Sequence, residues 1–132
     1  MEALRILIVD DEEELVSALT ERLNLRGFVA SGATRGDEAL NILETKEFDV
    51  VLLDLKMPGL GGLEVIRRIK NARPSLEVIL LTGHGSMKSI EEGMALGAFD
   101  YLMKPVKIEN LVNILKVAGS SGLPQDDERE DA

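Results

Sequence analysis

The sequence predicts an α/β domain built on a doubly wound, five-stranded parallel sheet with five helices. Two observations predict this class. Short apolar runs rich in Val, Ile and Leu alternate five times with stretches in which apolar residues recur at helical spacing. The length of 132 residues matches one domain, and no internal repeat is visible.

The first part of the chain holds two strands and two helices. Leu4–Val9 predicts a strand buried on both faces, because its apolar run is nearly continuous. Glu12–Arg26 has apolar residues at helical spacing, and Gly27 occupies the position typical of a helix C-cap. Phe28–Ala30 predicts a short second strand. Thr34 is expected to cap a second helix that runs to about Lys46.

The middle of the chain contains the most apolar strand. Asp49–Leu53 is expected to be central in the sheet for that reason. The loop after it is rich in Pro and Gly and must bend sharply. A third helix begins near Leu63 and ends at Pro74, and Glu77–Leu81 predicts the fourth strand.

The last part of the chain adds a strand between two helices. Ser86 is expected to cap a helix closed by Gly97, with Met87 and Met94 as packing residues. Ala98–Met103 predicts a short fifth strand. Apolar spacing then predicts a last helix from Lys107 to about Ala118. We therefore assign residues 1–118 to the domain and residues 119–132 to an acidic, flexible tail or linker remnant.

Composition excludes several functions. The net charge is −9, and only four aromatic residues are present, so direct binding of nucleic acid is not expected. No apolar run is long enough for a membrane span, and the first residues lack the pattern of a secretory signal. There is no cysteine, which excludes disulfides and thiolate chemistry. A cytoplasmic location fits these features.

Polar residues follow the predicted strands at their carboxyl ends. Asp10 and Asp11 follow the first strand, Asp54 the third, Thr82 the fourth and Lys104 the fifth. Right-handed crossovers favour the flavodoxin-like strand order 2-1-3-4-5, in which ligands bind at this edge of the sheet. We therefore expect these side chains to meet in one crevice.

The chemistry of these groups suits a phosphoryl group. Carboxylates about 4 Å apart repel by about 4 kcal/mol at an effective dielectric constant of about 20. A divalent cation relieves that repulsion, and short carboxylates suit Mg²⁺. A lysine and a hydroxyl beside the metal would neutralise phosphoryl oxygens, and a carboxylate can itself act as the nucleophile.

Four segments in order resemble the receiver domain of two-component response regulators. The resemblance covers Leu4 to about Ala118 and rests on ILIVDDEEE at Ile6–Glu14, VVLLDLKMPGLGGLEV at Val50–Val65, VILLTGHGS at Val78–Ser86 and GAFDYLMKPV at Gly97–Val106.

The resemblance implies a phosphorylation-dependent signalling switch rather than an enzyme with a separate substrate. Asp54 would accept a phosphoryl group from a phosphohistidine of a sensor histidine kinase or histidine phosphotransfer protein. Mg²⁺ would be bound by Asp11, by Asp54 and by the backbone carbonyl of Lys56, with Asp10 holding a metal-bound water or balancing charge. Lys104 would pair with the phosphoryl group.

The resemblance also implies how the signal leaves the site. Thr82 would move toward the phosphoryl oxygens, Tyr101 would rotate inward, and the Lys104–Pro105 bond would be cis. The face altered would be that of the fourth helix, fifth strand and fifth helix. This face would bind a downstream protein or a missing output domain, or form a homodimer.

Alternatives remain open at this point. Taken singly, Asp54, Asp10 and Asp11 could be cap or turn residues, and Lys104 could be a solvated surface lysine. His84 reads as an ordinary loop residue. The fold could also serve as a protein–protein interaction module that works without phosphorylation. A stand-alone receiver is favoured over the excised part of a longer regulator, which the sequence does not exclude.

Overall fold

The computed structural model describes residues 3–83 and 87–120. Its centre is a five-stranded parallel sheet in the order β2-β1-β3-β4-β5, which confirms the predicted fold class and strand order. The strands are β1 (Arg5–Val9), β2 (Val29–Ala33), β3 (Val50–Asp54), β4 (Glu77–Thr82) and β5 (Asp100–Met103).

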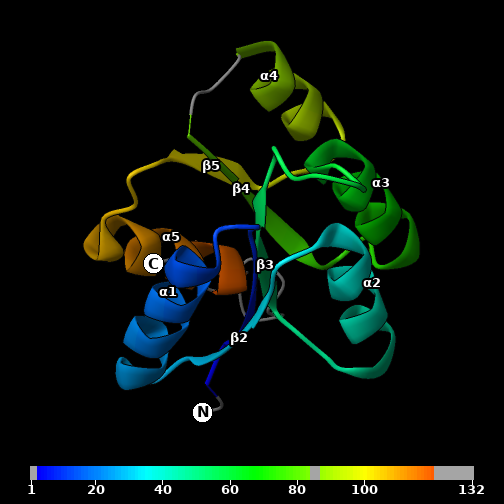
Figure 1. The fold of residues 1–132 in the computed structure, drawn as a ribbon. Coiled ribbons are helices and arrows are strands. Elements are labelled where there is room, and N and C mark those ends of the chain that lie inside the picture. Colours follow the sequence, from blue (N-terminus) through cyan, green and yellow to red (C-terminus); the bar gives the residue numbers. More distant parts are fainter. Residues whose placement is uncertain (1–2, 84–86, 121–132) are drawn as a thin grey trace, which may run out of the picture.

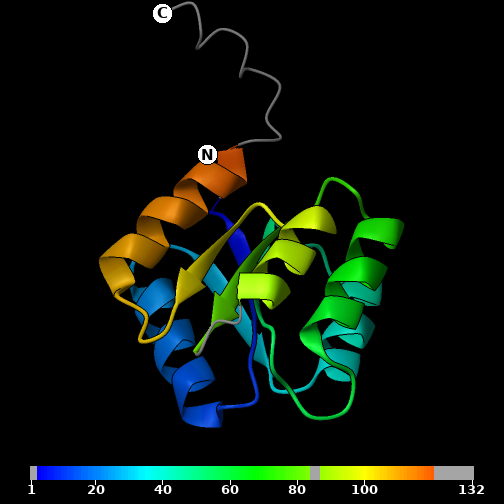
Figure 2. The same ribbon diagram turned by 90° about the horizontal axis from the view of Figure 1, so that it is seen from above.

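Helices cover both faces of the sheet. In Figure 1, α1 and α5 lie on one side of the strands, and α2 and α3 lie on the other. Figure 2 shows the same layers from above, with α4 beside α3. The helices are α1 (Glu13–Leu25), α2 (Gly36–Thr45), α3 (Gly62–Ala72), α4 (Met87–Ala95) and α5 (Ile108–Ser120). In the described part of the chain, no helix is long and apolar enough to cross a membrane.

The central strand β3 is buried along its whole length, because helices pack on both of its faces. Val51 and Leu53 belong to the core under α2, α3 and α4, whereas Val50 and Leu52 belong to the core under α1 and α5. Successive side chains of a strand point to opposite faces, so one continuous apolar run serves both cores. Asp54 is the last residue of this strand and lies where the two cores end.

Two predictions for the second βα unit were wrong. The strand is Val29–Ala33, not Phe28–Ala30. Backbone pairing with β1 extends it through Ser31 and Gly32, which are not typical strand residues. Helix α2 is capped at Arg35, and its cap has no side-chain hydrogen bond. Thr34 instead lies outside the helix, and its backbone N–H donates to Oε1 of Glu38.

Helix α4 also differs from expectation. Met87 and Met94 were predicted to pack inward, but their exposed fractions are 61% and 38%. The helix packs instead through Ile90 and Gly93, which are buried. The predicted cap at Ser86, and His84, lie outside the described residues.

Helix α5 continues to Ser120, past the expected end near Ala118. Ala118 is buried in the core, and a Cβ atom at Gly119 would lie 2.6 Å from the side chain of Leu4. The helix therefore keeps packing on the start of the sheet at the position where glycine suggested a break. The acidic tail predicted for residues 119–132 falls mostly outside the described residues.

Candidate functional site

A groove of about 700 Å³ opens at the carboxyl edge of the sheet. It lies over the ends of β1, β3 and β5, the edge at which ligands bind in doubly wound folds. Its lining residues are Asp11, Glu12, Leu15, Asp54, Lys56, Gly83, Lys104, Pro105 and Val106.

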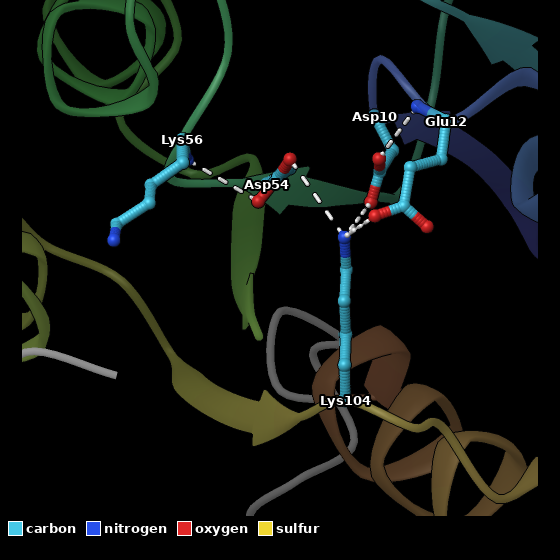
Figure 3. Close-up of polar contacts among 5 residues, drawn as sticks. All are labelled: Asp10, Glu12, Asp54, Lys56 and Lys104. Atoms are coloured by element: carbon cyan, nitrogen blue, oxygen red, sulfur yellow. Dashed lines mark hydrogen bonds and ion pairs between the residues drawn. The ribbon is translucent and has the colours of Figure 1, made fainter. Parts of the chain in front are cut away.

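Asp54 lies at the floor of this site with only 3% of the residue exposed. Its Oδ1 accepts a hydrogen bond of 3.2 Å from the backbone N–H of Lys56, whose side chain points away in Figure 3. Burial raises the pKa of Asp54 to about 6, and the nearby Asp10 carboxylate adds to the rise. The carboxylate is therefore held in a setting that penalises its charge.

Lys104 reaches from the end of β5 into the space between Asp54 and Asp10, as Figure 3 shows. Its ammonium forms an ion pair of 2.8 Å with Oδ2 of Asp10 and lies 3.8 Å from Oδ2 of Asp54. Burial alone would lower the pKa of Lys104, but its contacts with Asp10 and Glu12 outweigh that effect and raise the pKa. The lysine is therefore a fixed positive charge in the site.

Three carboxylates come together at this edge. Asp10, Asp11 and Asp54 each offer an oxygen within 4.8 Å of the others. Asp10 is fully buried, and its Oδ1 accepts a hydrogen bond from the backbone N–H of Glu12, whereas Asp11 is exposed. Oxygen ligands at this spacing fit Mg²⁺, which takes few carboxylates and keeps several waters.

The loop after β3 depends on a close approach of backbone to backbone. A Cβ atom at Gly62 would lie 2.4 Å from the carbonyl oxygen of Asp54 and 2.6 Å from Cα of Leu55. The N–H of Gly62 donates to the carbonyl of Leu55. The first residue of α3 is therefore pressed against the end of β3, and this contact fixes the backbone that carries Asp54.

Thr82 links the site to β5. It is 2% exposed at the end of β4, and its carbonyl accepts a hydrogen bond of 2.8 Å from the backbone N–H of Lys104. Tyr101 lies on β5 opposite Leu80, with 37% of its surface exposed. The Lys104–Pro105 peptide bond is cis.

The structure thus brings Asp10, Asp11, Asp54 and Lys104 into one site, with Thr82 at the end of the adjoining strand. Tyr101 lies on β5, outside this group of charges. One residue was missed by the sequence analysis: Oε2 of Glu12 accepts a hydrogen bond of 3.1 Å from Lys104. The run of acids after β1 was a signal for it, but the residue at which α1 begins had to be known to select Glu12.

Comparison with known proteins agrees with this geometry. Residues 6–116 match the protein family described as "Response regulator receiver domain". The chain is 36% identical over 112 residues to sporulation initiation phosphotransferase F of Bacillus subtilis, covering 85% of this chain and 90% of that protein. It is 38% identical to the uncharacterized transcriptional regulatory protein YkoG of the same species, covering 89% of this chain but 52% of that longer protein.

Solved structures show the same fold over nearly the whole chain. A CheY-like response regulator receiver domain protein from Methanospirillum hungatei superposes with a TM-score of 0.87 at 27% identity, covering 99% of this chain and all of the other. A response regulator receiver domain protein from Clostridium thermocellum superposes with a TM-score of 0.84 at 35% identity, covering 89% and 94% of the two chains.

Proposed function

The chain belongs to the response regulator receiver domain family of two-component systems, and from that premise we propose that it is a phosphorylation-dependent signalling switch. Asp54 accepts a phosphoryl group from the phosphohistidine of a sensor histidine kinase or histidine phosphotransfer protein. The observation that carries this proposal is a buried carboxylate at the end of β3, flanked by two further carboxylates and one lysine.

The transfer uses the Asp54 carboxylate as nucleophile. One of its oxygens attacks the phosphorus, and the P–N bond of the phosphohistidine breaks as the O–P bond of an acyl phosphate forms. The electron pair of the broken bond stays on the imidazole nitrogen. The N–H of Lys56 holds Oδ1 of Asp54, which fixes the orientation of the carboxyl group before the attack.

Mg²⁺ would be held by Asp11, by Asp54 and by the backbone carbonyl of Lys56, with Asp10 behind them. When bound, it supplies positive charge for the phosphoryl oxygens. Lys104 supplies a second positive charge from the space between Asp54 and Asp10, where its ion pair with Asp10 already holds it. The chain turns over no separate substrate in this scheme, although water could release the phosphoryl group as phosphate.

The signal leaves through the α4-β5-α5 face. The backbone N–H of Lys104 donates a hydrogen bond to the carbonyl of Thr82. A movement of either residue toward the phosphoryl group therefore shifts the ends of both β4 and β5. The face carries exposed apolar side chains at Met87, Met94 and Tyr101, which suit contact with another protein. Its partner would be a downstream protein, an output domain or a second copy of this chain.

Incubation with acetyl phosphate and Mg²⁺ tests the proposal directly. A switch gains one phosphoryl group per chain, which intact-protein mass spectrometry detects. A receiver fold used only as an interaction module gains none, and that result would overturn the proposal.

A further inference from the structure

Glu12 contacts Lys104 in this site, but the proposed phosphoryl transfer gives Glu12 no role. It occupies the N-cap position of α1, but its side chain makes no capping hydrogen bond. Its carboxylate turns instead toward Lys104, and Oε2 accepts a hydrogen bond of 3.1 Å from the ammonium (Figure 3). The Glu12 side chain is 60% exposed, whereas that of Lys104 is 15% exposed. The contact therefore lies at the rim of the groove, above the buried part of the site.

The ammonium of Lys104 is shared among three carboxylates. It has three N–H donors, and it lies 2.8 Å from Asp10 and 3.1 Å from Glu12. The distance to Asp54 is 3.8 Å, which is too long for a hydrogen bond. A phosphoryl group on Asp54 would need this ammonium as a direct partner. Glu12 holds the same ammonium by a hydrogen bond at the rim of the groove.

We propose that Glu12 is a positioning residue that competes with the phosphoryl group on Asp54 for Lys104, and so weakens the hold of the site on that group. The inference rests on the proposed function, because it requires a phosphoryl group at Asp54. We assign this part to Glu12 rather than to Asp10, because Asp10 is fully buried and the Glu12 side chain is exposed at the rim.

A purely structural role for the Glu12 side chain fits less well. The contact that Glu12 makes with Asp10 comes from its backbone N–H, which any residue except proline would keep. Its side chain makes no capping hydrogen bond to the first turn of α1, and more than half of it is exposed. Its carboxylate therefore acts mainly on Lys104.

The test measures affinity for beryllofluoride, a stable phosphoryl mimic, at saturating Mg²⁺ by NMR titration. Glu12→Gln keeps the size of the side chain and removes its charge, and Glu12→Ala removes the contact altogether. Glu13→Gln is the matched control, because it removes the same charge from an exposed position in the first turn of α1. Mg²⁺ affinity is titrated separately for each variant without beryllofluoride.

Competition predicts that Glu12→Gln and Glu12→Ala both bind beryllofluoride about two- to fivefold more tightly than Glu13→Gln, the effect typical of an exposed ion pair. Neither variant should gain Mg²⁺ affinity, because each has lost a negative charge near the metal. Equal affinities of Glu12→Gln and Glu13→Gln would overturn the inference. Weaker binding by Glu12→Ala alone would also overturn it, since that result indicates a structural tether. Failure of the unaltered protein to bind beryllofluoride with Mg²⁺ would overturn the proposed function itself.

Discussion

The ammonium nitrogen of Lys104 faces Oδ2 of Asp54 at 3.8 Å, outside hydrogen-bond distance, while it lies 2.8 Å from Oδ2 of Asp10. The lysine therefore compensates Asp10 more fully than Asp54. Burial and the Asp10 carboxylate raise the pKa of Asp54, and Lys104 lowers it. The raising effects are larger, so the pKa of Asp54 is about 6. In the metal-free protein the charge on Asp54 therefore lowers the free energy of unfolding, and this effect can be measured.

Asp54→Asn should stabilise the metal-free protein. The pKa of Asp54 is about 6 in the folded chain against 3.8 for an ordinary Asp, so the folded state binds more protons between these values. Stability is then lost as the pH rises from about 4 to 7. Asn cannot ionise and escapes this loss, so the variant should gain about 1 to 3 kcal/mol at pH 7 and almost nothing near pH 4.

Urea unfolding in excess chelator at several pH values measures this difference. Asp37→Asn is the control, because Asp37 is exposed and pairs with Arg35 on the surface. That control should not become more stable at pH 7, because an exposed carboxylate pays no burial cost for its charge. An Asp54→Asn variant no more stable than the unaltered protein at pH 7 would contradict the description of Asp54 as a strained charge.

Mg²⁺ should stabilise the unaltered protein and should be required for its labelling by acetyl phosphate. Three carboxylates within 4.8 Å repel one another until a cation binds. At a concentration ten times its dissociation constant, Mg²⁺ should add about 1.4 kcal/mol to the free energy of unfolding. Asp11→Asn should lose most of this gain. Full labelling in excess chelator would show that the carboxylates do not work through a metal.

Gly62→Ala should destabilise the chain, because its Cβ would press on the backbone of Asp54 and Leu55. We expect a loss of about 2 kcal/mol, typical of overpacking at a rigid contact. Gly61→Ala is the matched control, since a Cβ there meets nothing within 4 Å and φ is −75°. Thermal unfolding of the two variants decides the point, and equal losses would show that the close approach is unimportant.

Much of the fold could be predicted because its signals are local. The continuous apolar run of β3 places it in the centre of the sheet, and the crossover rule gives the strand order. Strand β2 could not be bounded this way. Ser31 and Gly32 are poor strand formers, but a Cβ at Gly32 would lie 2.3 Å from Cγ1 of Val16. Only the packing of α1 on β2 shows why a glycine belongs there.

The candidate site was predictable from the expected order and direction of the strands. Asp54 ends a strand, Asp10 and Lys104 each follow one directly, and parallel strands bring these positions to one edge. Glu12 could not be separated from its acidic neighbours Glu13 and Glu14. That distinction depends on where α1 begins and on the direction in which each side chain leaves the first turn.

Thr82→Ala should uncouple the site from the α4-β5-α5 face. The hydroxyl at the end of β4 is the donor that a phosphoryl oxygen can recruit, and its loss leaves Asp54 and Lys104 intact. NMR shift maps with beryllofluoride and Mg²⁺ should show changes at Tyr101 and α4 in the unaltered protein and in Thr82→Ser. In Thr82→Ala these changes should shrink, while those around Asp54 remain. Equal shifts at Tyr101 in both variants would remove Thr82 from the switch.

The most direct measurement is the intact mass of the protein and of Asp54→Asn after incubation with acetyl phosphate and Mg²⁺. The unaltered protein should gain one phosphoryl group that hydroxylamine removes, as an acyl phosphate requires. Asp49→Asn should label normally, because Asp49 precedes β3 at the opposite edge of the sheet, where it pairs with Arg5. Asp54→Asn should gain no phosphoryl group. Labelling of this variant at the same rate as the unaltered protein would contradict the assignment of Asp54 as the phosphoryl acceptor.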